Sequence, residues 1–379
     1  MEIIRASTHI IKFCFALVLI VGSFWVAPKV QANSSETLAL AVDEYSRGKV
    51  MSVEREEIST EVGENLLTLF LKVKINSGVE KNKEVVVEYQ IRGTGQEQRK
   101  LHVGDTVVID KNILPDGTVN YYITEPYRLN ALASLGFLFF LVTLITAGKR
   151  GLFSFFGLVV TLGIIAFFIV PQISQGANPF TISLIGAALI AGISLVLGHG
   201  FNKQTGVALL SIMVTISLAM VLSIVFVNIS HLFGLGTEEA FYLQTGMEKA
   251  INLRGLLLGG IIIGVLGVLD DVVTAQVAAV AELRAANPAL SAKELYIRAS
   301  RIGHEHIVAV VNTLVLAYVG AAFPLVLLFQ TFQLPWWVTL NTEMISEEVV
   351  RTLIGSVALV AAVPIATSLA VWYFHRQSK

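Results

Sequence analysis

The chain of 379 residues contains a single cysteine, Cys14, and few charged residues. One cysteine excludes a disulfide or a cysteine-based metal site within one chain. Charged residues make up only 15% of the sequence and hydrophobic residues 54%, an apolar excess that a soluble domain could not cover with polar surface. The formal net charge of −1 gives no electrostatic basis for binding nucleic acid. These absences predict a protein whose main partner is the lipid bilayer.

The motifs of the common enzyme classes are also missing. The sequence has no phosphate loop, nucleophile elbow, zinc-protease motif or dinucleotide fingerprint. His304 and His306 stand at i and i+2, which places them on different faces of a helix and makes a poor metal site. His199, between two glycines at a helix end, is interpreted as structural. We therefore expect a protein that is not an enzyme and that carries no metal or cofactor.

Residues 1–32 form an N-terminal targeting segment. Basic residues precede an apolar run at 13–27, and Val30-Gln-Ala32 offers small residues at the spacing that a signal peptidase accepts. The apolar run is shorter than the ~20 residues that a transmembrane helix needs. The segment is either a cleaved signal peptide or a retained membrane anchor, and both predict that the following residues are exported.

Residues 33–127 are polar and show the alternation of β-strands. Apolar and polar residues alternate at 67–75, 84–91, 101–109 and 120–124. Turn sequences such as Gly93-Thr-Gly95 and Pro115-Asp-Gly117 separate these runs. Short strands with this punctuation predict a small extracytoplasmic β domain, and an OB-like barrel is one topology that would fit.

Residues 128–379 read as a multipass helical membrane domain. Apolar stretches occur at 129–147, 152–170, 180–198, 205–229, 253–281, 306–329 and 352–374, and each can cross ~30 Å of hydrocarbon as a helix. The short loops on one side carry most of the lysine and arginine, including Lys149, Arg150 and Lys203, and this side is predicted to be cytoplasmic. The sequence thus predicts seven spans in the plasma membrane, with the β domain outside and the C-terminus in the cytoplasm.

The cytoplasmic loop at 282–304 contains a helix start. Ser291 and Glu294 have the spacing of a capping box, and Leu295, Ala299 and Ile302 then recur on one helical face. This pattern predicts a short amphipathic helix that lies along the membrane surface.

Two adjacent carboxylates, Asp270 and Asp271, interrupt the apolar run at 253–281. An ionised carboxylate in hydrocarbon costs several kcal/mol unless it is paired, hydrated or protonated. Two adjacent acids also oppose one another's ionisation. The pair is therefore a candidate proton relay, and the alternative is that both acids are hydrated structural groups near the cytoplasmic end of the helix.

The surroundings of the two acids follow from helical spacing. Gly260, Gly264, Gly267, Asp271 and Thr274 recur at intervals of three and four, so they share one face. Small residues let membrane helices approach closely, and we therefore expect Asp271 to point at a neighbouring helix.

The next span offers three polar side chains. Asn312, Thr313 and Tyr318 lie in the apolar stretch at 306–329, and the first two could hydrogen-bond a carboxylate at similar depth. Ordinary polar contact between helices is an equally good interpretation of these residues.

Three segments together resemble a known family. Gly198-His-Gly-Phe-Asn-Lys-Gln-Thr-Gly206, Leu266-Gly-Val-Leu-Asp-Asp-Val-Val-Thr-Ala-Gln276 and the stretch from His306 to Pro324 are similar to the YibE/F family, bacterial multipass membrane proteins of uncharacterised function. More distantly, Gly264–Asp271 and the next span resemble helices of resistance-nodulation-division exporters and of Sec accessory subunits. That resemblance implies a proton relay at Asp270 and Asp271, and a homodimer or a paired homologous subunit, because the chain would correspond to one half of an exporter. The large extracytoplasmic insertion of those exporters is absent, since only residues 171–179 occupy its place.

These features predict a proton-coupled transporter or energy-coupling component that uses the aspartate pair, with an extracytoplasmic substrate or protein as the partner of the β domain. The alternative is a membrane scaffold or assembly factor that does not transport and that binds an envelope protein through its β domain.

Overall fold

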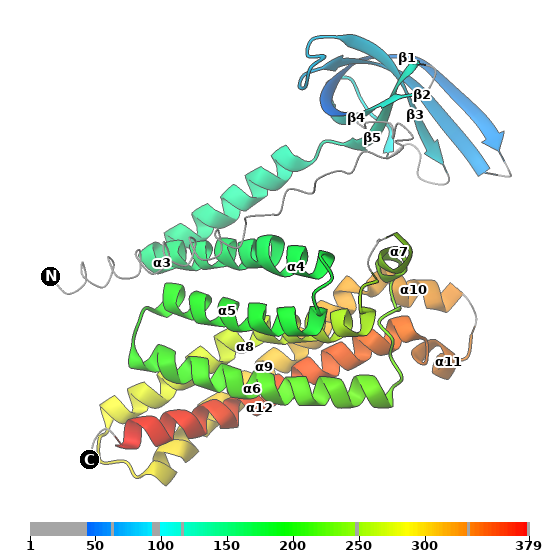
Figure 1. The fold of residues 1–379 in the computed structure, drawn as a ribbon. Helices are drawn as coiled ribbons and strands as arrows, with labels where there is room; N and C mark the ends of the chain where they lie inside the picture. The colour runs from blue at the N-terminus through cyan, green and yellow to red at the C-terminus, as the bar shows by residue number, and fades with distance from the viewer. Residues whose placement is uncertain are drawn as a thin grey trace. The chain divides into compact units, whose positions relative to one another are not determined.

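The computed structural model describes residues 44–61, 64–92, 99–114, 117–246, 250–331 and 334–376. The predicted signal or anchor segment, residues 1–32, lies outside the described residues. The chain divides into two compact units, and the boundary falls between Val142 and Thr143. The first unit contains a β-barrel and the second a helical bundle (Figure 1).

The β unit is a closed barrel of five strands (Figure 1). Its strands are β1 (Glu44–Glu61), β2 (Glu64–Ile75), β3 (Glu84–Arg92), β4 (Thr106–Ile113) and β5 (Val119–Pro126). They follow the order β1-β2-β3-β5-β4, in which all pairs are antiparallel except β3 with β5. A five-stranded Greek-key barrel is the architecture of OB folds, so this topology agrees with the OB-like expectation.

Alternation along the strands builds the barrel core. Leu67, Leu69, Leu71 and Val73 of β2 are buried, because every second side chain of the strand points into the closed barrel. Strand β1 was not predicted, since its second half carries Glu54, Arg55, Glu56 and Glu57 and lacks a regular apolar alternation. This half pairs with β2 but extends beyond the pairing with β4, which ends at Lys49, and forms an exposed arm.

A polar cluster on the barrel joins the loop before β3 to β4 and β5. The Tyr121 hydroxyl donates to Glu80 Oε2 (2.8 Å) and accepts from Lys83 Nζ (2.7 Å). Lys83 and Lys111 also form ion pairs with Glu80, at 3.1 and 3.4 Å. The Tyr121 hydrogen bond, together with the two lysines, holds the pKa of Glu80 below its usual value of 4.5.

The described residues of the second unit form helices and the loops between them. Its elements are α3 (Leu129–Ile164, which begins in the first unit), the π-helical segment η1 (Ile165–Ile169), α4 (Val170–Ser174), α5 (Pro179–His199), α6 (Lys203–Ile229), α7 (Glu238–Gly246), α8 (Leu253–Ala286), α9 (Ala292–Ala321), α10 (Phe323–Thr331), α11 (Trp336–Leu340) and α12 (Glu343–Arg376). Among the described residues, six helical stretches are long and apolar enough to cross a membrane. Helix α12 packs against α6, α8 and α9, and α5 packs against α8 (Figure 1).

The first two predicted spans form one helical stretch, Leu129–Ser174, and this explains why the structure has six such stretches where the sequence predicts seven spans. Gly148 interrupts the stretch with a φ of 56° and a ψ of −134°, which are not helical values. A positive φ is readily adopted by glycine, because it lacks a Cβ atom. The apolar runs on the two sides of Gly148 are thus separate helical segments joined at a kink.

The predicted surface helix is not a separate element. The capping box of Ser291 and Glu294 is confirmed, but the helix that it starts continues through α9 to Ala321. Leu295 and Ala299 are fully buried in the bundle core, whereas Ile302 is 49% exposed. No proline lies between the predicted surface segment and the next span, and the helix continues through Gly303, so the two form one helix.

A buried amide connects three helices of the bundle. Gln276 of α8 is 3% exposed, and its Nε2 donates to the Ala299 carbonyl of α9 (3.0 Å) and to Thr367 Oγ1 of α12 (2.7 Å). The Thr367 hydroxyl in turn donates to the Val363 carbonyl (2.6 Å). Hydrogen bonds of this kind hold helices together in an apolar environment.

The loop between α6 and α7 is held by two carboxylates at the start of α12. Glu343 Oε1 accepts hydrogen bonds from the backbone N–H groups of Phe233 (2.6 Å), Gly234 (3.0 Å) and Leu235 (3.3 Å). Glu347, which is 4% exposed, accepts from the Gly236 N–H (3.1 Å). The loop is thus bound through its backbone.

Candidate functional site

Asp270 lies on the side of α8 that packs against α5. The Ser194 hydroxyl of α5 donates to Asp270 Oδ2 at 2.9 Å. Asp270 Oδ1 is buried and has no hydrogen-bond partner among the described residues. His199 lies further along α5, at its C-terminal end. Asp270 is therefore a partly buried carboxylate with one satisfied and one unsatisfied oxygen.

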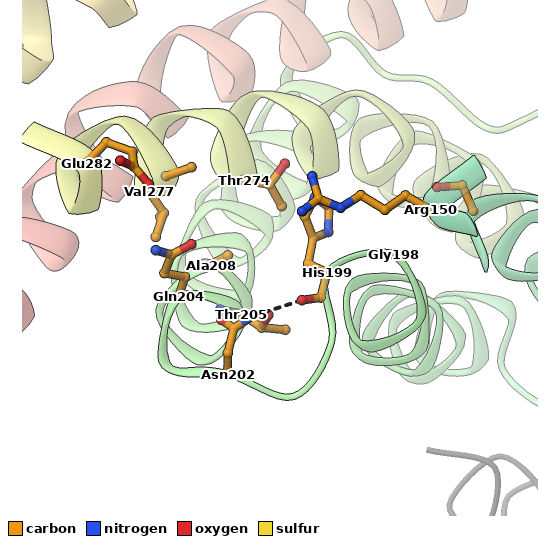
Figure 2. Close-up of a pocket in the computed structure, with 12 residues that line it drawn as sticks. Arg150, Gly198, His199, Asn202, Gln204, Thr205, Ala208, Thr274, Val277 and Glu282 are labelled. Carbon is orange, nitrogen blue, oxygen red and sulfur yellow. Dashed lines mark hydrogen bonds between the residues drawn. The ribbon is translucent and has the colours of Figure 1, made fainter. Parts of the chain in front are cut away.

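A polar cavity of about 500 Å³ begins one helical turn beyond Asp270. Thr274 lies on its wall, and the Thr274 hydroxyl donates to the Asp270 carbonyl at 2.8 Å. Arg150, His199 and Glu282 also line the cavity (Figure 2). A polar space of this size can hold water molecules.

The loop between α5 and α6 forms another wall of the cavity. Asn202 caps α6 by accepting from the Thr205 N–H at 2.9 Å, and its side-chain amide donates to the His199 carbonyl at 2.8 Å (Figure 2). Gln204 also lines the cavity. The cap thus fixes the backbone of His199 relative to the start of α6.

Asp271 and the glycines on its face were predicted to pack against a neighbouring helix, but most of this face is open within the single chain. Asp271 is exposed, and a Cβ added at Gly260 or Gly267 would meet no atom within 4 Å. Only Gly264 has a close neighbour on this face, the hydroxyl of Tyr318. Within one chain, Asp270 and not Asp271 therefore faces a packed helix. Helix α8 is apolar on all sides, so its composition did not indicate which face is buried.

The polar residues of α9 do not reach the acids. Asn312 and Thr313 are exposed, and the Thr313 hydroxyl donates to the Ala309 carbonyl of its own helix (3.1 Å). The carboxylate of Asp270 instead accepts a hydrogen bond from Ser194 of α5, and His199 lies further along the same helix; the sequence reasoning missed both. A serine in an apolar helix gave no signal by itself, and His199 was interpreted as structural. The position of both residues in one apolar helix, five residues apart, was the indication available in the sequence.

No metal site accompanies these residues. In the ranges that the structure describes, no group of three or more His, Cys, Asp or Glu side chains could hold a metal ion.

Comparison with protein families decides the classification of the chain. The model of the YibE/F-like protein family matches residues 135–376, which is more than half of the sequence. The chain belongs to the YibE/F-like family. The match covers the helical bundle, including Asp270 and the cavity, and begins after the barrel. No curated protein and no solved structure matches the chain.

Proposed function

We propose that this YibE/F-like protein is a proton-coupled transporter or energy-coupling component of the plasma membrane, in which Asp270 binds and releases the proton and Asp271 is the second member of the relay. The observation that carries the proposal is the Asp270 carboxylate, which lies in an apolar helix with one oxygen unpartnered and a polar cavity one turn away. An ionised carboxylate in such a place costs several kcal/mol unless it is paired, hydrated or protonated, and acids inside membrane helices therefore usually mark functional sites. In this proposal the chain transports or couples and is not an enzyme.

The cavity supports proton access from one side. Its wall includes Arg150, His199 and Glu282, and the positive loops favour a cytoplasmic location for these ends of the helices. Water in the cavity would carry protons along its wall as far as Thr274, one helical turn from the Asp270 carboxylate. Protonation neutralises the carboxylate and weakens its charge-assisted hydrogen bond with Ser194. The proton thereby changes the contact between α5 and α8.

The proposed topology has seven spans, with the segments before and after Gly148 as two of them. The kink at Gly148 and the positive residues Lys149 and Arg150 beside it support a cytoplasmic turn at this point. The barrel is then outside and the C-terminus in the cytoplasm. Alkaline phosphatase fused after residue 127 should be active, and the same enzyme fused after residue 376 should be inactive. The opposite result would reverse the orientation.

Proton coupling is tested in proteoliposomes that contain a pH-sensitive dye. An external acid pulse is applied while valinomycin and potassium hold the membrane potential at zero. Vesicles with the wild-type protein should acidify faster than empty vesicles, and Asp270→Asn should remove the difference because the amide cannot exchange a proton. Glu239→Gln, which neutralises an exposed carboxylate of α7, is the matched control and should acidify like the wild type.

Two outcomes would contradict the proposal. Wild-type vesicles that acidify no faster than empty ones would show that the protein conducts no protons under a gradient. Asp270→Asn vesicles that acidify at the wild-type rate would show that the flux bypasses this carboxylate. Insertion of each variant is checked by its yield in the reconstituted membrane.

The scaffold function remains the second candidate, and the exposed arm of β1 favours it. Ile58 is 73% exposed on this arm, next to a strand edge that β4 leaves unpaired. An open edge can accept a strand from another protein. A photo-cross-linking residue at position 58 would capture a partner in this case, and Asp270→Asn would leave the function of the protein in cells unchanged.

A further inference from the structure

One membrane face of the bundle is left uncovered within the single chain. On α8 this face comprises Gly260, Gly267, Asp271 and Ala275, all of which are exposed. Helix α9 lies beside it, and only 11% of the most apolar part of α9 is buried, compared with 50% for α8 and 56% for α12. We refer to these exposed residues of α8, together with Ala309, Asn312 and Thr313 of α9, as the α8/α9 face.

This face carries polar groups that lipid cannot satisfy. In the described part of the chain, no group donates a hydrogen bond to the Asp271 carboxylate, and the Asn312 amide has no hydrogen-bond partner. Asp271 is 15 residues from Leu256 and 10 from Ala281 along the apolar run, or roughly 22 and 15 Å of helix. An acid at this depth rarely faces lipid, and it normally faces a bundle interior or a hydrated space.

The shape of the face fits a second helix. Nothing lies within 4 Å of a Cβ added at Gly260 or Gly267, so a helix backbone can approach α8 closely there. A groove of about 310 Å³ lies between α8 and α9 and is lined by Ala275, Glu305 and Ala309, among others. The groove can receive side chains from the approaching helix.

We propose that the α8/α9 face is the contact between two copies of this chain, related by a two-fold axis. The proposal rests on the membrane placement of α8 and α9 in the proposed function. In a two-fold contact, if one residue of the first copy meets a second residue of the other copy, the reverse contact also forms. The face contains both an acceptor, Asp271, and a donor, the Asn312 amide, and is therefore complementary to itself. Each copy donates from α9 to the Asp271 carboxylate of the other, and the glycines allow the close approach.

Site-specific cross-linking tests the contact in native membranes. Ala275→Cys and Ala309→Cys are made separately in a Cys14→Ser chain, and two copies with different affinity tags are co-expressed. A short bis-maleimide should join the two tagged copies at either position. Leu210→Cys on α6, which is 50% exposed but lies on another helix, is the matched control and should give less than one tenth of the product.

A second variant separates the contact from the fold. Gly267→Leu fills the α8/α9 face and should reduce cross-linking at position 275 at least tenfold, while the single chain has open space for the added Cβ. Gly192→Leu on α5 has the same open space and should leave the cross-linking unchanged.

The outcomes are decisive for the two-copy contact. Absence of the cross-linked pair at both positions, equal product at position 210, or exclusive cross-linking to a different protein would overturn it. Unchanged cross-linking in Gly267→Leu would also overturn it. Asp270→Asn should cross-link like the wild type, so a failure of the proton function and a failure of this contact are seen separately.

Discussion

The substitution Gln276→Leu tests how much the buried amide contributes to the bundle. Leucine has a similar volume, so packing is largely retained and the main loss is two hydrogen bonds, to the Ala299 carbonyl and to Thr367 Oγ1. The Thr367 hydroxyl keeps its bond to the Val363 carbonyl, so no buried donor is orphaned. Interhelical hydrogen bonds in membrane proteins contribute on average ~0.6 and at most ~1.7 kcal/mol each. We therefore expect the free energy of unfolding to fall by about 1–3 kcal/mol.

Gln276→Glu should cost more than Gln276→Leu. The carboxylate places an acceptor where the amide donates to Ala299, and residue 276 is only 3% exposed. A buried charge without a donor costs more than the loss of two neutral hydrogen bonds. The matched control is Gln244→Leu on α7, an exposed position where the change should be within ~0.5 kcal/mol.

Stability is measured by steric trapping of the full chain in bicelles. The reasoning would be refuted by a loss below ~0.5 kcal/mol in Gln276→Leu, or by a Gln276→Glu variant no less stable than the leucine variant. Either result would mean that the amide does not hold α8, α9 and α12 together.

Three other substitutions test separate parts of the fold. Gly186→Val should destabilise the bundle by about 1–3 kcal/mol, because the added Cβ would overlap a side chain of η1, and Gly192→Ala, where the space is open, is the control. Tyr121→Phe removes the hydrogen bond that lowers the pKa of Glu80. A lowered pKa stabilises the fold above the usual value of 4.5, and this stabilisation is lost as the pH falls through the lowered value. The variant should thus melt earlier than the wild type at pH 7, and the difference should disappear in acid; a difference that is constant with pH would contradict this. Ser291→Ala should cost about 1 kcal/mol at the start of α9, and hydrogen exchange in the first turn should accelerate; unchanged exchange would show that the capping box is dispensable.

Features with local causes could be predicted from the sequence. The capping box at Ser291 depends on side chains three residues apart, and it forms as expected. Most strands of the barrel follow from alternation, although β4 begins at Thr106 and not at residue 101, and β1 was missed because its glutamate-rich arm has no buried side to produce a pattern. The apolar helices follow from length and composition.

The orientation of those helices could not be predicted in the same way. In a soluble protein the polar face of a helix identifies the buried face by exclusion. In α8 both the packed side and the open side are apolar, so the glycine stripe was the only available guide, and it lies on the open side of the single chain. The acid pair was found from sequence, whereas the contact of Asp270 with Ser194 depends on how α5 and α8 pack.

The two carboxylates at the start of α12 that bind the loop between α6 and α7 determine which positions of that loop can change in sequence. Glu343 and Glu347 bind the loop at 233–236 through peptide N–H groups, which every residue except proline provides. Side chains at Phe233 and Leu235 are therefore free to change without loosening the attachment. Gly234 and Gly236 are not, since a Cβ at the first would overlap the backbone of Leu253 and at the second would press on Glu347. The loop between α6 and α7 thus tolerates other side chains at positions 233 and 235, but no added side chain at positions 234 and 236.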